Sequence, residues 1–299
     1  MVKIAPIALT LSLGAAVSGL SIPDVDENGV QVAIGFDPTA AFFTTASDVE
    51  SPEAVEYNVD ELLGLGDLIA EPSANFTEAA IAGRAIYGND DRVALTDSAY
   101  PWSAIGKVQW SNGVWCSGTL VGPRHVITAR HCTPTNGEKV SVRFSPFYYN
   151  GETKYPGSAV TTYIYATNKA GQCLYGLDWA VHILKDRIGE QRGFFGARTL
   201  TSAMLNKNNI NNAGYPGDKF NGQRPIRSKG SKLLGMGGCA SDSPATANVD
   251  TAGGQSGSSI WAADNYVLGT LYGSSSASSI WATGQALTNA ISSARKDFK

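Results

Sequence analysis

The chain of 299 residues has few charged residues and no long apolar run beyond its N-terminus, and each shortage excludes a class of protein. Charged residues make up 16% and apolar residues 43%, with 33 glycines, which excludes a disordered polymer, a collagen-like chain and a coiled coil. The net charge of −3 gives no indication of a nucleic-acid or anionic-membrane partner. Beyond the N-terminal stretch, no run approaches the length of a membrane-spanning helix, about twenty apolar residues.

Histidine and cysteine are also scarce, with three and four residues, and neither has the spacing of metal ligands. There is no Cys-x-x-Cys sequence and no pair of neighbouring histidines, so no metal ion is expected. No organic cofactor is expected either. The even number of cysteines favours two disulfides formed in an oxidising compartment. Three pairings are open to the four residues, which are Cys116, Cys132, Cys173 and Cys239.

The charge is divided unevenly along the chain. Residues 1–84 carry a net charge of −11 and residues 85–299 carry +8, which predicts a boundary between the two parts. At the N-terminus, Lys3 precedes an apolar run and small residues up to Ser18, the pattern of a secretory signal peptide over residues 1–18. A membrane anchor or a buried helix is the alternative, but the run is short for a membrane span. We therefore expect a secreted, extracellular protein.

Residues 19–84 are acidic, lack cysteine and show little periodicity, apart from a short helix predicted over Ser51–Leu65. We interpret the segment as a propeptide, and the alternative is a disordered acidic tail. A basic residue before a small apolar one predicts processing after Arg84. The competing processing site is Arg92, which precedes Val93.

From Tyr100 onward, short apolar runs alternate with clusters of Gly, Pro, Asn and Ser. This pattern predicts many short strands joined by turns, and hence an all-β barrel or sandwich. Helical spacing is clear only near the C-terminus, where it predicts one terminal helix. The apolar residues with this spacing are Leu287, Ile291, Ala294 and Phe298.

Three segments contain residues typical of nucleophilic catalysis. In the first, two predicted strands end at His131, which lies directly beside a cysteine. A catalytic histidine needs a fixed ring, and a neighbouring disulfide would restrain its backbone. The alternative is an ordinary loop histidine.

In the second segment, Asp178 lies at the edge of an apolar strand, where a carboxylate is costly to bury unless it meets hydrogen-bond donors or a cation. A strand-capping surface aspartate is the alternative there, and His182 is interpreted as a strand residue, partly buried or facing solvent.

The third segment, residues 250–258, reads DTAGGQSGS and places glycines on both sides of Ser256. Such glycines let the backbone fold tightly enough for its N–H groups to converge on an oxyanion. A serine hydroxyl needs a base to remove its proton, and the histidine of the first segment would supply one. A flexible Gly/Ser loop is the alternative.

His131, Asp178 and Ser256 occur in this order, separated by 47 and 78 residues. That is the chain order of the chymotrypsin-type triad and not that of subtilisins or α/β-hydrolases. On these motifs the chain resembles the trypsin/chymotrypsin-like serine endopeptidases, and in particular their secreted glutamyl-endopeptidase-like branch of bacteria and fungi. The resemblance extends from about Ile86 to the C-terminus and includes the sequence GYPG at residues 214–217.

The resemblance implies an all-β fold of two packed six-stranded antiparallel β-barrels with a C-terminal helix. The protease domain would cover residues 85–299. Within it the first barrel would span about 85–190, the second about 191–285 and the helix about 286–298. We expect a monomer that acts on protein or peptide substrates.

The resemblance also assigns roles to single residues. His131, Asp178 and Ser256 would form the catalytic triad, and the N–H groups of Gly254 and Ser256 the oxyanion hole. The disulfides would be Cys116–Cys132, on the family match, and Cys173–Cys239, from the two cysteines that remain. An extended substrate would add to the edge strand made by Leu271, Tyr272 and Gly273.

Two residues bear on substrate choice. Asp250 resembles the floor of the trypsin pocket, which favours Arg or Lys before the cleaved bond. Thr251 matches a threonine with which glutamyl endopeptidases hold glutamate, but no histidine follows Ser256, so glutamate selectivity lacks its main cation. A basic preference is our expectation, with a glutamyl or a broad preference as alternatives.

One departure from animal trypsins concerns activation. Those enzymes have an Asp directly before the nucleophile, which pairs with the new N-terminus, whereas this chain has Gln255. That ion pair cannot form, so activation must use another device, such as removal of a propeptide that acts as an inhibitor. An inactive secreted binding protein on the same fold remains the alternative from another class of function.

Overall fold

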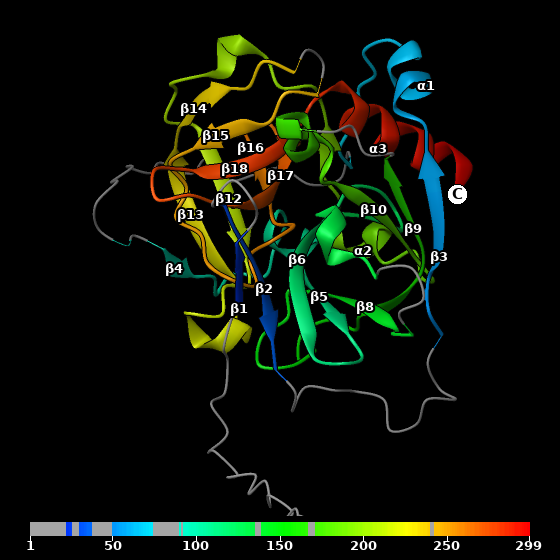
Figure 1. The fold of residues 1–299 in the computed structure, drawn as a ribbon. Coiled ribbons are helices and arrows are strands. Elements are labelled where there is room, and N and C mark those ends of the chain that lie inside the picture. The colour runs from blue at the N-terminus through cyan, green and yellow to red at the C-terminus, as the bar shows by residue number, and fades with distance from the viewer. Residues whose placement is uncertain are drawn as a thin grey trace, which may run out of the picture.

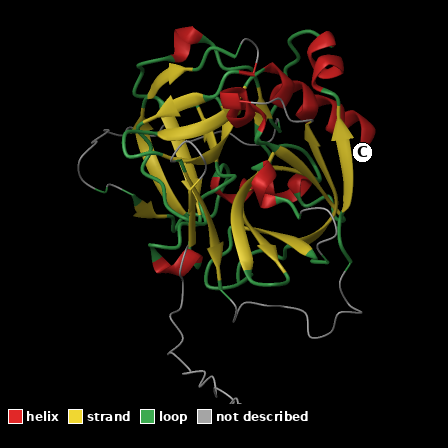
Figure 2. Cartoon of the chain, viewed as in Figure 1, coloured by secondary structure: helices red, strands yellow, loops and turns green. Residues whose placement is uncertain are grey.

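The computed structural model describes residues 22–25, 30–37, 50–73, 90, 92–134, 139–166, 171–239 and 242–299 of the chain. The expected signal peptide and the expected processing site at Arg84 lie outside these residues. Strands make up most of the regular structure in the described part (Figure 2).

The strands in chain order are β1 (Ile22–Val25), β2 (Gln31–Phe36), β3 (Glu53–Tyr57), β4 (Val93–Ala94), β5 (Ile105–Trp110), β6 (Val114–Leu120), β7 (His125–Thr128), β8 (Val142–Pro146), β9 (Ser158–Ala166), β10 (Ala180–Leu184), β11 (Gly196–Ala197), β12 (Ile210–Gly214), β13 (Ile226–Ser231), β14 (Leu233–Met236), β15 (Ala245–Ala247), β16 (Ser259–Trp261), β17 (Tyr266–Ser274) and β18 (Ser279–Thr283). The helices are α1 (Val59–Gly64), α2 (Gly189–Arg192) and α3 (Gln285–Asp297). The two 3₁₀ helices that bear on the site are η4 (Arg130–Cys132) and η5 (Gly171–Leu177).

The first half of the protease part forms a closed barrel. Antiparallel pairs join β5 to β6, β6 to β7, β7 to β10, β10 to β9, β9 to β8 and β8 back to β5. Fully buried apolar side chains fill its interior, among them Leu120, Phe144 and Ile164. A strand with one face in such a core alternates buried and exposed residues, and β9 does so at its start.

The second half forms a sheet that curls around a separate apolar core, which includes Ile260, Leu268 and Trp281. Its strands follow the order β4, β13, β12, β16, β17, β18, β15, β14. β13 leads into β14 across the single residue Lys232, and the result is a half-barrel (Figure 1). The prediction of an all-β chymotrypsin-like fold with two barrels is confirmed, with the second barrel present as this half-barrel.

The terminal helix is also confirmed. α3 buries the side chains of Leu287, Ile291 and Ala294, which follow one another at helical spacing on one face. These residues join the core cluster of the first barrel. No helix in the described part of the chain is long and apolar enough to cross a membrane.

The acidic segment contains more structure than its sequence predicts. The helix expected over Ser51–Leu65 is replaced in its first half by β3, and α1 begins only after Asn58. β3 forms because it pairs in parallel with β9, from Glu53 opposite Thr162 to Tyr57 opposite Ala166. This pairing to a distant strand overrides the local preference for helix.

α1 has a sequence-encoded start. Asn58 is its N-cap, and its side-chain oxygen accepts hydrogen bonds from the N–H groups of Asp60 and Glu61 at 2.8 and 3.3 Å. The two acidic residues in the first turn also suit the positive end of the helix dipole. Val59 and Leu62 are buried in the core cluster of the first barrel, so residues 50–73, called here the docking segment, are part of the folded unit.

Another part of the acidic segment, residues 30–37, crosses between the two halves and is called here the crossing segment. Its strand β2 pairs with β1 as a hairpin, with β17 of the half-barrel and with β6 of the closed barrel. In Figure 1 this hairpin (dark blue) lies in front of the two groups of strands.

Two histidines on strands of the first barrel are buried, His125 on β7 and His182 on β10. His182 is fully buried on β10, contrary to the prediction that it is partly buried or faces solvent, because β10 is enclosed between β7 and β9. Neither of its ring nitrogens has a hydrogen-bond partner among the described residues. Burial lowers the pKa of His182 to about 3 and, as the main cause, that of His125 to about 4.

These two histidines should make the fold sensitive to acid. Between the unfolded pKa of about 6.5 and pH 4, the unfolded chain binds protons that the folded chain excludes, so stability falls as pH falls. We expect the free energy of unfolding to drop by about 3 kcal/mol per histidine from pH 7 to pH 4. Urea denaturation at several pH values measures this loss, and His182→Leu should remove one histidine's share. An equal slope in the variant and the parent chain would contradict the assignment.

Candidate active site

His131 and Asp178 lie in direct contact in the structure. The imidazole Nδ1–H donates to Asp178 Oδ2 over 2.7 Å, and the backbone N–H of His131 donates to Oδ1 over 3.0 Å. Both oxygens of a carboxylate that is 8% exposed are therefore satisfied, which removes the cost of burying it. Because the carboxylate holds the proton on Nδ1, Nε2 is left as the basic nitrogen.

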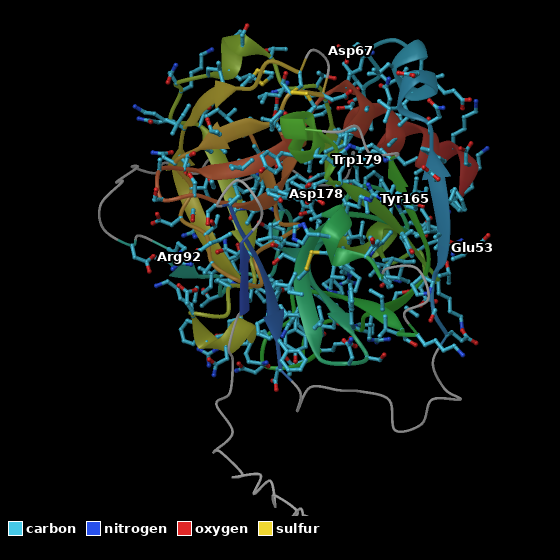
Figure 3. The ribbon with its side chains drawn as sticks, in the orientation of Figure 1. Glu53, Asp67, Arg92, Tyr165, Asp178 and Trp179 are labelled. Carbon is cyan, nitrogen blue, oxygen red and sulfur yellow. A yellow bond between two sulfur atoms is a disulfide. The ribbon has the colours of Figure 1, made fainter. Side chains whose placement is uncertain are left out.

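The fold brings these two residues together from elements far apart in sequence. His131 lies in η4, directly after β7, and Asp178 lies between η5 and β10. β7 and β10 are antiparallel neighbours, with Thr128 opposite Ala180, so the end of one strand meets the start of the other. Figure 3 shows Asp178 near the middle of the molecule. Next to the histidine, Cys132 forms a disulfide with Cys116 of β6.

Ser256 lies in the loop of residues 250–258, called here the serine loop. The loop is held by its own bonds, from Gln255 N–H to Ala252 C=O at 3.0 Å and from Ser258 N–H to Gln255 C=O at 2.8 Å. Gly254 has φ +90°, a backbone conformation that residues with a side chain rarely adopt. A Cβ there would also meet the Trp115 indole and the Tyr215 carbonyl, so only glycine fits.

The serine loop packs against the histidine end of the first barrel. Ser117 N–H donates to the Ser256 carbonyl at 2.9 Å, and the Ser117 carbonyl accepts from Thr128 Oγ1 at 2.8 Å. A Cβ on Gly257 would clash with Thr128 and crowd the Ala129 N–H. The loop therefore abuts the turn that carries His131. Ser256 itself is buried, with 2% of its surface exposed.

The predicted substrate edge is part of β17. Leu271 N–H donates to Ser258 C=O at 2.8 Å, and Leu271 C=O accepts from Gly257 N–H at 3.0 Å, so the strand runs directly beside the serine loop. The Tyr272 ring lies edge-on to the His131 ring, 5.8 Å between centroids, and 4.5 Å from the ring of Tyr175. The following residue, Gly273, is covered by the crossing segment.

The second disulfide joins Cys173 of η5 to Cys239. It ties the segment that precedes Asp178 to the half-barrel, as expected, and η5 packs against β18 there.

The two residues predicted to select the substrate, Asp250 and Thr251, are half-buried at the start of the serine loop. The described residues contain no group of side chains able to hold a metal ion.

Some residues of the site carry no signal in the sequence. Ser117 Oγ accepts from Tyr215 N–H and donates to Gly254 C=O, at 2.8 and 2.9 Å, and so joins three segments. Trp115 Nε1–H donates to Tyr215 C=O at 3.0 Å. The bonded residues lie 98 to 137 positions apart, so only the tertiary structure reveals these contacts.

The chain is similar to several known proteins. A family model described as Trypsin matches residues 93–290. The chain is 32% identical over 190 residues to a glutamyl endopeptidase of Bacillus licheniformis, which covers 60% of this chain and 55% of the relative. It is 38% identical over 73 residues to inactive serine protease 35 of Homo sapiens, 22% of this chain and 17% of that protein. The chain thus spans about half of the first relative and less of the second.

Two solved structures share the fold. A Glu endopeptidase superposes with a TM-score of 0.61 at 19% identity, covering 71% of this chain and 100% of that one. The thermostable serine protease AL20, from an extremophilic microorganism, gives 0.52 at 20% identity, covering 64% and 97%. The family match extends over residues 93–290, about two thirds of the chain, a range within which positions 131, 178 and 256 lie. This chain belongs to the trypsin family of serine proteases.

Proposed function

We propose that the protein is a secreted serine endopeptidase, made as an inactive precursor, that cleaves peptide bonds with His131, Asp178 and Ser256. The observation that carries the proposal is the two-point bond of Asp178 to His131, at 2.7 and 3.0 Å, beside the loop that holds Ser256. This bond fixes both the tautomer and the orientation of the imidazole, as a general base requires.

In the proposed reaction, His131 Nε2 takes the Ser256 proton as the hydroxyl oxygen attacks the peptide carbonyl. Asp178 stabilises the imidazolium that forms, and the N–H groups of Gly254 and Ser256 bind the oxyanion. His131 then protonates the leaving amine, and the C–N bond breaks. A water molecule, deprotonated by His131, hydrolyses the acyl-enzyme and restores the serine.

A fluorophosphonate probe tests this function, since it reacts covalently only with an activated serine. The processed protein should be labelled at Ser256, and His131→Ala should not be labelled although its Ser256 is unchanged. Absence of labelling in the processed parent chain would instead favour an inactive binding protein. The relative named inactive serine protease 35 makes that alternative concrete.

For substrate choice we propose a preference for Arg or Lys before the cleaved bond, on the basis of Asp250. The resemblance to a glutamyl endopeptidase favours glutamate instead. A panel of fluorogenic peptides that differ only at this residue separates the two. The Asp250→Asn variant should lose the advantage of Arg over Gln peptides, and no such advantage in the parent chain would refute the basic preference.

We further propose that the crossing segment inhibits the precursor by occupying the substrate site. Gln31 lies opposite Ser274 at the end of β17, and Gly35 lies opposite Trp115 at the start of β6, both in antiparallel pairs. A peptide substrate that adds to an edge strand makes the same kind of pairing. The crossing segment therefore resembles a bound peptide in its backbone contacts.

The position of Ser256 supports this reading. Its carbonyl is bonded to Ser117 of β6, and the residue after it is bonded to Leu271 of β17. Ser256 thus lies between the same two strands that residues 31–35 bridge. Nε2 of His131 is also buried, without a hydrogen-bond partner among the described residues, although a base must reach its substrate.

The docking segment supports the proposed inhibition, because it attaches the acidic segment to the enzyme at a different place. Asn289 of α3 donates to the carbonyls of Leu62 and Gly66, at 2.7 and 2.6 Å, and accepts from Leu68 N–H at 3.1 Å. These bonds, and burial of Leu62, keep the acidic segment on the enzyme. A tethered crossing segment has a high effective concentration at the site, which strengthens inhibition without further contacts.

Gly35→Val should release this inhibition. A side chain at residue 35 would overlap the Trp115 indole, so β2 should lift away from β6. We expect the uncleaved precursor to react with a fluorophosphonate at least tenfold faster than the parent precursor. Gel resolution of the precursor from shorter products confines the measurement to uncleaved chain. Glu53→Gln, on the exposed side of β3, is the matched control, and equal rates for Gly35→Val and the parent would contradict the proposal.

A further inference from the structure

Gln255, the residue directly before Ser256, is fully buried, and its side-chain amide is bonded on both sides. Its Oε1 accepts from Ala252 N–H at 3.0 Å and lies 3.4 Å from the Nη1 donor of Arg92. Its Nε2 donates to Asn212 Oδ1 at 3.1 Å. The conformation of the serine loop therefore depends on what holds this amide.

Asn212 extends the bonding to the far side of the nucleophile. Its Nδ2 donates to Ser258 Oγ and to Ser259 C=O, each at 2.9 Å. Residues on both sides of Ser256 are thus joined through one buried chain of amides, which ends at the guanidinium of Arg92. In such a network each group polarises the next, so a charged donor at one end orients the whole chain.

Arg92 is held rigidly where it meets this network. Its guanidinium forms a two-point contact with Asp218, at 3.2 and 2.6 Å, and another with Asp90, at 3.0 and 3.1 Å. Only 7% of the side chain is exposed. Burial works against the charge, but the two carboxylates outweigh it and raise the pKa of Arg92 above its ordinary value.

The ion pair with Asp218 reaches the serine loop by a second route. Asp218 follows Gly217, whose N–H donates to Gly253 C=O at 2.6 Å. The backbone after Arg92 is fixed too, since β4 pairs with β13 and Leu95 N–H donates to Pro225 C=O at 2.8 Å. In Figure 3, Arg92 lies beside β4.

We propose that Arg92 is a positioning residue for the nucleophile: its guanidinium, through Gln255 and Asp218, orders the serine loop in place of a free N-terminal amine. The inference rests on the proposed peptidase function. It explains how a chain with Gln255 keeps an ordered loop while still uncut. It also requires that maturation occur before Arg92, because cleavage after Arg92 would separate the guanidinium from β4.

The first test is the mature N-terminus, read by mass spectrometry of the processed protein. We expect it to lie at or upstream of Arg92, so that the guanidinium is retained. A mature chain that begins at Val93 would overturn the inference whatever its activity.

The second test compares Arg92→Ala with Arg92→Lys and with Arg187→Ala, a control that removes an exposed ion pair elsewhere. We expect Arg92→Ala to lower kcat ten- to a hundredfold with little change in KM, since loop order affects oxyanion binding more than peptide binding. Millimolar guanidinium should restore part of the lost kcat. The kcat of Arg92→Lys should lie between that of Arg92→Ala and that of the parent chain. An unchanged kcat, or a loss that follows the unfolded fraction without rescue, would overturn the inference.

Hydrogen exchange separates this inference from the proposed function. In Arg92→Ala the amides of residues 252–258 should exchange at least tenfold faster, while those of β5 to β10 stay unchanged. Faster exchange in a protein whose parent chain neither cleaves peptides nor binds a fluorophosphonate would leave the positioning role intact and refute the peptidase function. Unchanged exchange in an active enzyme would refute the positioning role alone.

Discussion

Ser256→Ala should lower kcat of the processed enzyme by about a millionfold, because it removes the atom that attacks the substrate. The proposed oxyanion donors are backbone N–H groups, which the substitution leaves in place. A residual rate of about 10³–10⁴ over the reaction in water should therefore persist. Peptide hydrolysis by purified protein, measured with the parent and variant at equal concentration, gives the ratio.

The serine variant is also a sound control for folding. The backbone bonds from Ser117 to the Ser256 carbonyl and from Gly257 to Leu271 do not involve the Ser256 side chain, so the substitution leaves them in place. The thermal midpoint should therefore stay within a few degrees of the parent. Ser117→Ala, by contrast, removes bonds to Tyr215 and Gly254 and should lower stability. Peptidase activity retained by Ser256→Ala would refute the assignment of the nucleophile.

Asp178→Asn should lower kcat by about 10⁴-fold with little change in fold. The carboxylate accepts from the ring Nδ1–H and from the backbone N–H of His131. An amide oxygen can still accept the backbone bond, but the amide N–H₂ then faces Nδ1 and favours the tautomer with the proton on Nε2. A histidine in that tautomer cannot take the Ser256 proton.

The loss in Asp178→Asn should appear in kcat and not in KM, since Asp178 acts on the base and not on the substrate. Asp186→Asn is a matched control, because Asp186 also accepts a side-chain hydrogen bond in the first barrel, from Ser158, and lies outside the site. Equal rates for Asp178→Asn and Asp186→Asn would show that Asp178 has no role in the reaction.

The two proposed controls on activity act at different places. The crossing segment would block access to Ser256, whereas Arg92 would hold the serine loop in order before and after cleavage. Processing of this precursor would then consist of removing an inhibitor and not of building the site. This division matches the absence of an aspartate before Ser256, since no new N-terminal ion pair is needed.

The sequence by itself determined the family, the fold class and the three candidate catalytic residues. Glycines around Ser256, a histidine beside a cysteine and an aspartate at a strand edge are local patterns, because each reflects what a short segment needs in order to do its chemistry. The spacing of Leu287, Ile291 and Ala294 likewise determined α3, since an amphipathic helix encodes its own buried face.

Only the tertiary structure decided what the acidic segment and Arg92 contact. β3 is a strand because β9 offers it an edge, and nothing within residues 53–57 specifies that partner. The crossing segment lies between the two halves because β2 pairs with β6 and β17, strands more than 70 residues away in the sequence. The sequence indicates Arg92 only as one of two candidate processing sites. In the structure its guanidinium contacts Asp218 and Gln255, which are 126 and 163 positions away in the sequence. Contacts between segments so far apart depend on the packing of the whole chain, and a local pattern cannot encode them.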